Sequence, residues 1–259
     1  MKGVVLAGGL GTRLRPLTHV LNKHLLPVYD RPMVYYPIQC LRNAGIEEVM
    51  LVTGEAHAGA FFDLLRNGEA FGLRRLAYAY QERVRGIADA LTYAERFADG
   101  EDICVILGDN IIERNIIEPA RRFRAQSGGA KILVTETNAP ERFGVVRVAG
   151  EGANRRIVDI AEKPSDPSSK TVATGIYFYD SKVFDICRSL EPSVRGEYEI
   201  TDVNRAYLRA GELTFDEIEG WWMDVGTHDS LLDASVRVRE TGANNVDGAP
   251  RRSGSYAGS

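Results

Sequence analysis

The sequence predicts an α/β protein with a mostly parallel central sheet and a partly antiparallel second half. Two observations lead to this fold class. Through about residue 130, short apolar runs alternate with segments whose apolar residues recur every three or four positions, which is typical of a parallel sheet covered by helices. Beyond that point, apolar runs follow one another across polar loops that contain glycine and proline, which is typical of antiparallel strands.

Strands and helices alternate through the first half of the chain. The expected strands are residues 4–7, 48–53, 76–81 and 103–107. The expected helices are residues 33–45, 58–65, 87–98 and 116–123. Because ligands of parallel sheets collect at the carboxyl ends of the strands, we expect Gly8, Gly9, Gln81 and Asp109 to lie near one another.

Strands come first in the second half, and helices close it. The expected strands are residues 131–135, 144–148, 157–161, 174–179 and 213–217, and the expected helices are 182–190, 201–210 and 227–238. No interdomain linker separates the halves, so residues 1–240 are expected to form one domain with halves 1–130 and 131–240. Residues 241–259 hold almost no large apolar side chain, which predicts a disordered tail.

The composition excludes several functional classes. With 259 residues, 44% of them hydrophobic, the chain can bury a substantial core. The net charge of −4 argues against nucleic acid as the main partner, because nucleic-acid-binding proteins carry a basic face. Cys40, Cys104 and Cys187 form no Cys-x-x-Cys unit, which indicates reduced thiols in a cytoplasmic protein. No apolar run is long enough to span a membrane, so we expect no membrane partner.

A glycine-rich loop follows the first strand and carries the first chemical signal. Gly8, Gly9 and Gly11 allow a ligand to approach the backbone closely, and successive N–H groups in such a loop can bind an anion. Arg13 would add charge-assisted contacts to phosphate oxygens. A P-loop is excluded because Thr12 and Arg13 stand where Lys-Ser/Thr is needed, and Leu14 breaks the dinucleotide fingerprint. A plain strand-to-helix turn is the alternative.

The chain resembles the sugar-phosphate nucleotidylyltransferases, most closely the glucose-1-phosphate thymidylyltransferase group, over about residues 1–238. The resemblance rests on several motifs in the order of that family, which are residues 6–18, Lys23 with 25–28, 107–110, 140–146, 162–164, 175–180, 193–204 and 222–227. It implies a three-layer Rossmann-like nucleotidyltransferase fold, in which residues 1–130 mainly bind the nucleotide. Residues 131–240 then form a partly antiparallel sugar-binding subdomain.

The reaction implied by the resemblance is attack of a sugar 1-phosphate oxygen on the α-phosphorus of a nucleoside triphosphate, with pyrophosphate as leaving group. The expected substrates are dTTP and glucose 1-phosphate, and the expected cofactor is Mg²⁺. Because the nucleophile is already an anion, no general base is required. Catalysis then consists of alignment and charge neutralisation.

The resemblance also assigns roles to individual residues. The catalytic residues are cations: Arg13, Lys23, Lys163 and Arg195. The nucleotide-binding residues are Leu6, Gly8, Gly9, Gly11, Thr12, Arg13, Gln81, Gly86 and Asp109. The residues that bind the sugar phosphate are Asn110, Gly144, Glu162, Lys163, Gly175, Tyr177 and Arg195. Asp109 and Asp224 are the implied Mg²⁺ ligands, since this hard cation prefers carboxylate and phosphate oxygens.

Simpler structural roles stand beside these assignments. Asp109 could cap the turn after its strand, and Asp224 could be a solvated turn residue. Lys163 could only form a surface ion pair with Glu162, Arg195 could be a solvated loop charge, and Gln81 could be a strand-end polar residue without a ligand. Trp221 and Trp222 are expected to fill core rather than to stack on a sugar.

Two features depart from the family pattern. The stretch 81–89 lacks the family's proline two residues before Gly86 and has Asp89 in place of a glutamine, which leaves the nucleotide and sugar preference open there. The long thymidylyltransferases continue into a C-terminal helical segment that helps to form an interface and an allosteric site. Without it, we expect a homodimer that has lost feedback inhibition.

Two other functions remain open. One is a uridylyltransferase or another nucleotidylyltransferase that acts on a different sugar or alcohol phosphate. The other is a sugar-nucleotide-binding regulatory subunit without turnover. The joint presence of Arg13, Lys23, Asp109, Lys163 and Asp224 argues against the second, because a decayed site would be expected to lose one of them.

Overall fold

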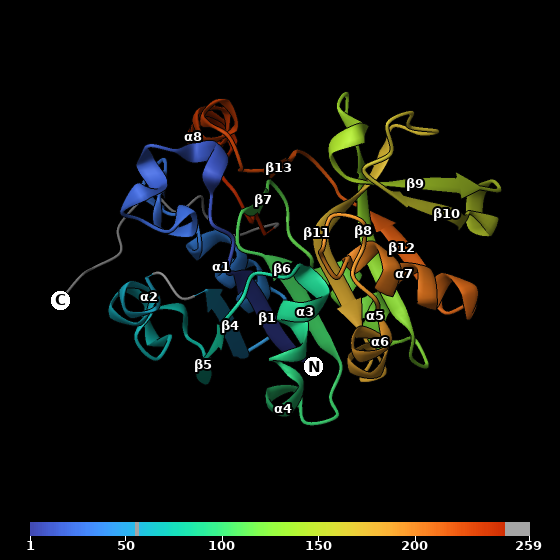
Figure 1. Ribbon diagram of the computed structural model, residues 1–259, viewed down its shortest axis with the longest axis horizontal. Coiled ribbons are helices and arrows are strands. Elements are labelled where there is room, and N and C mark those ends of the chain that lie inside the picture. The colour runs from blue at the N-terminus through green and yellow to red at the C-terminus, as the bar shows by residue number, and fades with distance from the viewer. Residues whose placement is uncertain (55–56, 247–259) are drawn as a thin grey trace.

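One nine-stranded sheet runs through both halves of the protein in the computed structural model, which describes residues 1–54 and 57–246 (Figure 1). Seven strands follow the order β10-β9-β11-β6-β1-β4-β5, while β8 pairs with β11 and β12. The bounds are β1 Lys2–Ala7, β4 Glu48–Gly54, β5 Arg75–Gln81, β6 Ile103–Leu107, β8 Ala130–Glu136, β9 Gly144–Ala149, β10 Arg156–Glu162, β11 Thr171–Tyr179 and β12 Leu213–Glu217.

The first half of the sheet is parallel, as predicted. Strands β6, β1, β4 and β5 pair in parallel, so their carboxyl ends share one edge. The helices of this half are α1 Tyr35–Asn43, α2 Ala58–Leu65, α3 Ile87–Thr92, α4 Glu95–Ala98 and α5 Ile117–Arg124. The prediction of a single helix over 87–98 was wrong. The hydrogen bond from Ala94 N to Leu91 O spans three residues instead of the four of an α-helix, so the regular helical bonding is interrupted between α3 and α4.

The second half is antiparallel around β11, as predicted from its strand-rich pattern. Strand β11 pairs antiparallel with β6, β8 and β9, and β9 pairs antiparallel with β10. The register of β11 against β8 shifts between Ala173 and Tyr177. This one long strand thus pairs with β6 of the parallel half and with β8 and β9 of the antiparallel half. Helices α6 Val183–Ser189 and α7 Ile200–Arg209 cover this half.

Two short two-stranded antiparallel sheets complete the fold. Strands β2 Pro27–Val28 and β3 Arg31–Pro32 form one, and β7 Asn110–Ile112 and β13 Trp222–Asp224 form the other. Helix α8 His228–Thr241 follows β13 and packs on β2. Short 3₁₀ turns lie at Thr12–Leu14, Leu17–His19, Lys23–Leu25, Glu69–Phe71, Pro140–Arg142 and Gly152–Asn154. The sequence did not predict the β7–β13 pair, because strands this short show no periodicity.

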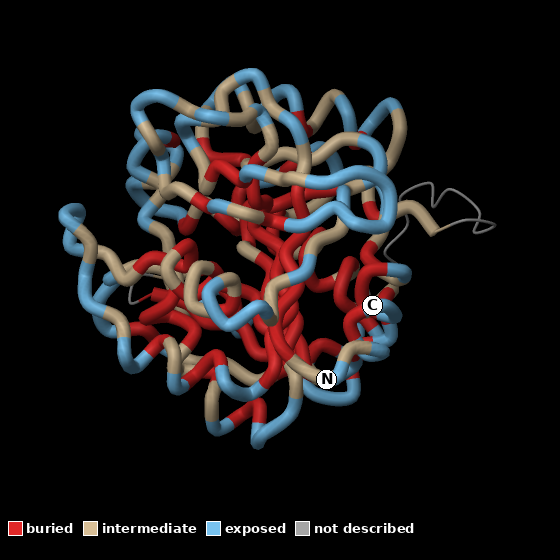
Figure 2. The backbone as a smooth tube through the Cα atoms, turned by 90° about the vertical axis from the view of Figure 1, so that its right-hand side faces the viewer, coloured by how far each residue is buried: buried red, intermediate tan, exposed pale blue. Residues whose placement is uncertain are grey.

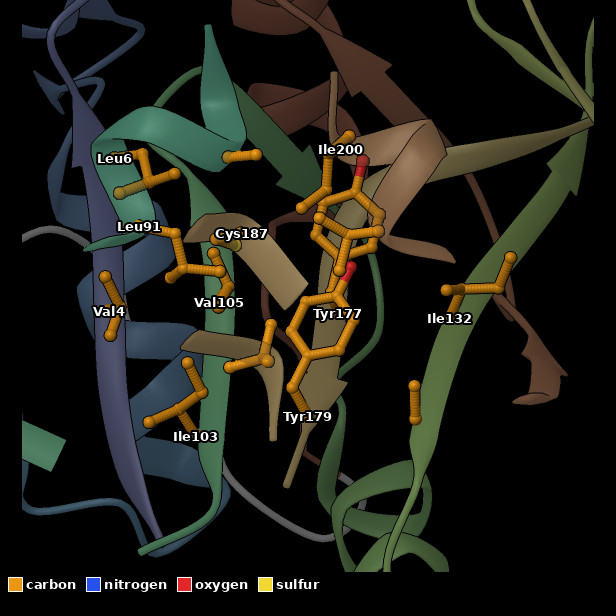
Figure 3. Close-up of a cluster of buried hydrophobic side chains, with 14 of the residues drawn as sticks. Val4, Leu6, Leu91, Ile103, Val105, Ile132, Tyr177, Tyr179, Cys187 and Ile200 are labelled. Carbon is orange, nitrogen blue, oxygen red and sulfur yellow. The ribbon is translucent and has the colours of Figure 1, made fainter. Parts of the chain in front are cut away.

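The sheet separates two hydrophobic layers. Alternate residues of β1 point to opposite sides, with Val4 and Leu6 facing α3, α6 and α7, and Val5 and Ala7 facing α1, α2 and α5. Figure 2 shows the buried segments gathered along this sheet, and Figure 3 shows the layer that contains Val4 and Tyr177. This arrangement confirms the three-layer fold. Among residues 1–54 and 57–246, no helix combines the length and apolar character needed to cross a bilayer.

The predicted tail begins later than the sequence suggests. Helix α8 extends to Thr241, and Asn244 is buried, with its N–H donating to Ile112 O and its side-chain Nδ2 to Tyr36 O. The prediction was therefore wrong for residues 241–246, because main-chain and amide hydrogen bonds, rather than apolar side chains, hold them. The remainder, residues 247–259, lies outside the described part of the chain.

Removing the Asn244 side chain is expected to destabilise the protein, because the hydrogen bond that its amide donates to the Tyr36 carbonyl in a buried setting would be lost. Asn244 has φ of 56°, so Asn244→Gly removes the amide without the backbone strain that alanine would add. We expect a loss of about 1–2 kcal/mol in the free energy of unfolding, measured by urea denaturation. The exposed Asn154→Gly is the control, and equal losses in both variants would contradict a specific contribution of the Asn244 bond.

Candidate active site

The glycine loop at the end of β1 faces polar side chains from two other segments. A Cβ on Gly8 would lie 3.0 Å from Gln81 Oε1, and a Cβ on Gly9 would lie 3.2 Å from Lys23 Cε. Gly11 has φ of 61°, in the left-handed region that favours glycine. The loop therefore lies against chemically active side chains, which a plain strand-to-helix turn would not require. The carbonyl of Leu6, which is also expected to contact the nucleotide, accepts one hydrogen bond from Gly108 N.

Asp109 is a buried carboxylate at the end of β6. It forms an ion pair with Lys23, and its other oxygen accepts a 3.1 Å hydrogen bond from Asn110 Nδ2. Burial alone would raise the pKa of Asp109, but the Lys23 ammonium and the neighbouring His24 lower it to about 2. The pKa of His24 itself falls to about 3 through burial and the Lys23 charge, so this imidazole is neutral at pH 7. These contacts do not cap the following turn, which was the simpler role for Asp109.

Asp224 reaches the same place from the far end of the chain. The β7–β13 pairing sets Asp224 opposite Asn110, and Val225 N donates to Asp109 O at 2.9 Å. Burial and the negative charge of Asp109 raise the pKa of Asp224 to about 6. Asp224 is thus a strand residue next to a second carboxylate, not a solvated turn residue.

This carboxylate pair has donor atoms suited to Mg²⁺. The described residues contain no group of three or more His, Cys, Asp or Glu side chains that could hold a metal ion. Two carboxylates alone leave most positions of an octahedral ion to water and phosphate oxygens, which is the usual way in which proteins bind Mg²⁺ with a nucleotide. The residues therefore fit an ion that arrives with a triphosphate.

Arg13 lies between the glycine loop and the C-terminal segment. A Cβ on Gly226 would lie 2.5 Å from Arg13 Nη2 and 3.5 Å from Asp224 Oδ2, so only glycine leaves room for this guanidinium. The positive charge of Arg13 acts on Asp224 and lowers its pKa against the larger effect of burial. Thr12 lies in the 3₁₀ turn before it and is exposed.

The antiparallel half supplies a second group of charges. The Arg195 guanidinium donates to both oxygens of Glu199 at 2.8 Å and to Glu162 Oε1 at 3.3 Å. Lys163 Nζ lies 3.4 Å from the same Glu162 oxygen. The Lys163–Glu162 ion pair considered as a simpler role is therefore present, and Arg195 is paired with carboxylates instead of being only a solvated loop charge. Their cationic side chains stay 43% exposed in Lys163 and 38% exposed in Arg195, which leaves both open to an anionic ligand.

Gly144 and Gly175, the glycines expected near the sugar, also lie in the antiparallel half, on β9 and β11. A Cβ on Gly144 would lie 3.0 Å from Thr201 Oγ1 and 3.6 Å from Glu162 Oε2. Gly175 lies at the irregularity in β11, and its N–H donates to Asn110 Oδ1 at 2.9 Å. The Gly175 N–H is therefore already bonded within the protein.

Asn110 and Tyr177 connect the two groups of charges. The oxygen of Asn110 also accepts from Trp222 Nε1 at 2.6 Å, and its amide nitrogen donates to Asp109. With 3% exposure and these bonds, Asn110 helps to hold the surrounding strands in position, and its contact with the sugar phosphate stays a prediction. Burial, Glu162, Asp224 and Asp109 all raise the pKa of Tyr177, so its buried hydroxyl lies in the field of all three carboxylates.

Gln81 and Gly86 border the glycine loop on its other side. Gln81 ends β5 and donates from Nε2 to Asp89 Oδ2 at 2.8 Å. Gly86 has φ of 106°, and a Cβ there would lie 2.5 Å from Tyr198 O, so this position requires glycine. The sequence reasoning did not assign a role to Asp89, although its departure from the family pattern marked it.

A cavity of about 340 Å³ opens beside Asp224. Its walls include Arg142, Phe143, Trp221 and Trp222, so both tryptophans border open space as well as packing on core residues. Asp224 is consequently reachable by a ligand.

Comparison with known proteins places this geometry among related enzymes. A family model described as nucleotidyl transferase matches residues 2–241. The chain is 42% identical to a glucose-1-phosphate thymidylyltransferase of Neisseria meningitidis, covering 92% of this chain and 83% of that protein. It is 45% identical to one of Mycolicibacterium smegmatis, covering 92% and 82%, respectively.

Solved structures give the same result for the fold. The crystal structure of a candidate glucose-1-phosphate thymidylyltransferase from Bacillus anthracis, in complex with a sucrose, aligns with a TM-score of 0.87 and 46% identity, covering 93% of this chain and 96% of that one. A UDP-glucose pyrophosphorylase bound to UDP-glucose aligns with a TM-score of 0.81 at 23% identity, covering 92% and 98%. At that identity the second similarity supports the fold alone.

Asp224→Asn is expected to stabilise the metal-free protein at pH 7, because it removes a buried charge that repels Asp109. We expect the free energy of unfolding to rise by about 1 kcal/mol in urea denaturation. Because folding raises the pKa of Asp224 to about 6, the folded protein binds a proton at this group more tightly than the unfolded chain does. The free energy of unfolding of the wild type should therefore fall as pH rises from about 4 to 6. The exposed Asp159→Asn should change little. A less stable D224N variant would refute the repulsion.

Proposed function

Because the chain belongs to the nucleotidyl transferase family, we propose that it transfers a thymidylyl group from dTTP to glucose 1-phosphate, which yields dTDP-glucose and pyrophosphate. The observation that carries this proposal is the meeting of the glycine loop, Lys23 and Asp109 with Asp224 at one edge of the sheet. The identity of 41–45% to curated thymidylyltransferases over most of the chain supports the choice of substrates.

The chemistry requires alignment and charge neutralisation rather than a base. The attacking phosphate oxygen is already anionic, and charge increases around the α-phosphorus as the reaction proceeds. Arg13 and Lys23 lie on the side of the glycine loop, where they would hold the triphosphate. Lys163 and Arg195 lie in the antiparallel half, where they would hold the sugar phosphate. The two substrates would thus be fixed from opposite halves of one sheet.

Mg²⁺ belongs to the proposal as the ion that Asp109 and Asp224 would hold. When bound, it supplies positive charge to the phosphate oxygens. Lys23 now neutralises Asp109 and would be available to a phosphate once that carboxylate has another cation beside it. The free, buried thiols Cys40, Cys104 and Cys187 support a cytoplasmic location, and the homodimer stays a prediction.

The alternatives differ from this proposal in measurable ways. A uridylyltransferase would prefer UTP over dTTP, while a regulatory subunit would bind nucleotides without turnover. The regulatory role is disfavoured by intact charged groups, since Arg13, Lys23 and both aspartates lie together.

The decisive experiment combines dTTP, UTP and other triphosphates with several sugar 1-phosphates and measures pyrophosphate release. We expect the highest kcat/KM with dTTP and glucose 1-phosphate. Asp109→Asn should lower turnover by on the order of 100-fold, because it removes a charge that the metal ion needs. Asp185→Asn, which loses an exposed partner of Arg188, should keep wild-type turnover. Absence of release with every pair would overturn the proposed function.

A further inference from the structure

The amide of Gln81 presents an unused acceptor to the glycine loop. Gln81 is only 2% exposed, and its Nε2 donates to Asp89 Oδ2 at 2.8 Å. Its Oε1 lies 3.0 Å from the point where a Cβ of Gly8 would stand. Among the described residues, no hydrogen bond to Oε1 is present, whereas its amide nitrogen is bonded. Asn204 Nδ2 is the one fully buried side-chain polar atom without a partner among the described residues, so Gln81 Oε1 is not sealed off, and a ligand group that donates a hydrogen bond can reach it from the loop.

Asp89 determines which end of the Gln81 amide faces the loop. An ionised carboxylate only accepts hydrogen bonds, so it must receive the NH₂ end of Gln81. Arg85 Nη2 donates to the other Asp89 oxygen at 2.7 Å, which holds the carboxylate in place. Asp89 is 8% exposed, in the first turn of α3. The amide therefore cannot rotate by half a turn without setting two acceptors against each other.

The surrounding loop is anchored independently of any ligand. Tyr198 N donates to Arg85 O at 2.7 Å, and Ala88 N donates to Tyr198 O at 3.1 Å. The Arg85 guanidinium also lies over the Tyr198 ring, 5.7 Å from its centroid. Arg85 and Asp89 are thus held by the segment that also carries Arg195, and the orientation of Gln81 is fixed before a nucleotide binds.

On the basis of the proposed function, we propose that Asp89 is a positioning residue that restricts the site to uracil-type and thymine bases. These bases carry an N3–H donor, which the fixed Gln81 Oε1 can accept. Cytosine carries an unprotonated N3 in the same position, so it would set a lone pair against Oε1. Asp89 acts through Gln81 and does not itself touch the base.

Asp89→Asn tests this role with almost no change in shape. An asparagine can accept or donate, so Gln81 could turn either end toward the loop and meet cytosine with its NH₂ group. The ligands are dUDP and dCDP, which differ only in the base edge. We expect wild type to bind dUDP more tightly, and D89N to reduce the ratio of the two dissociation constants on the order of 10-fold. Isothermal titration calorimetry measures both constants, and kcat/KM for dUTP and dCTP gives a second reading.

A double variant, Gln81→Glu with Asp89→Asn, separates orientation from general damage. The new amide at position 89 would donate to one oxygen of the new carboxylate at position 81 and leave the other oxygen as an acceptor. Discrimination against dCDP should therefore return. Damage to the loop would instead weaken dUDP and dCDP equally. Asp185→Asn is the matched control for a lost carboxylate with an arginine partner, and it should keep the wild-type ratio.

The outcomes distinguish this inference from the proposed function. An unchanged dUDP-to-dCDP ratio in D89N would overturn the role of Asp89 even if turnover is normal. Equal binding of the two nucleotides by wild type would overturn it as well. If wild type discriminates in binding but releases no pyrophosphate with any substrate pair, the proposed function fails, while the loss of discrimination in D89N still supports the role of Asp89.

Discussion

The constraint on which this site depends is the placement of two carboxylates close together inside a folded protein. Burial and mutual repulsion both disfavour two charges, and the opposite shifts in pKa of Asp109 and Asp224 are the consequence. Lys23 forms an ion pair with Asp109, and the charges of Lys23, Arg13 and Arg142 also lower the pKa of Asp224, but burial and Asp109 outweigh them. The arrangement costs stability in the free protein and would become favourable if these carboxylates hold Mg²⁺, as proposed.

The sheet makes this placement possible. Asp109 follows β6, the strand at which the parallel half meets the antiparallel half, and Asp224 ends β13, which pairs with β7 directly after Asp109. Asn110 joins these segments, because its single amide contacts β11 through Gly175, β13 through Trp222 and the carboxylate of Asp109. A side chain that the family resemblance assigns to the sugar phosphate thus also connects these segments of the free protein.

The cations of the antiparallel half have a different setting. Arg195 and Lys163 share Glu162, and Arg195 also contacts Glu197 and Glu199, so carboxylates partly neutralise both cations before a substrate binds. A phosphate entering this region would compete with carboxylates for the same guanidinium. Binding energy from the phosphate is therefore partly spent on displacing or sharing these partners. The glycine loop differs from this region, because the hydrogen-bond donors that it would offer to a phosphate are backbone N–H groups.

Local patterns in the chain were sufficient to establish most elements and the α/β fold class, because these follow from periodicity, and the glycines after the first strand marked the candidate phosphate loop. The site residues of the second half were predicted only from the family resemblance. Strand Ile103–Leu107 and helix Ala58–Leu65 needed no tertiary information. Which polar groups meet, and which are already bonded, emerged from the folded arrangement alone. Asn110, the pairing of Asp224 with β7 and the packing of Asn244 depend on contacts between distant segments, and hydrogen bonds of this kind leave no periodic trace in the sequence. The orientation of the Gln81 amide also depends on a contact between separate segments, because the carboxylate of Asp89, in the first turn of α3, can only accept hydrogen bonds.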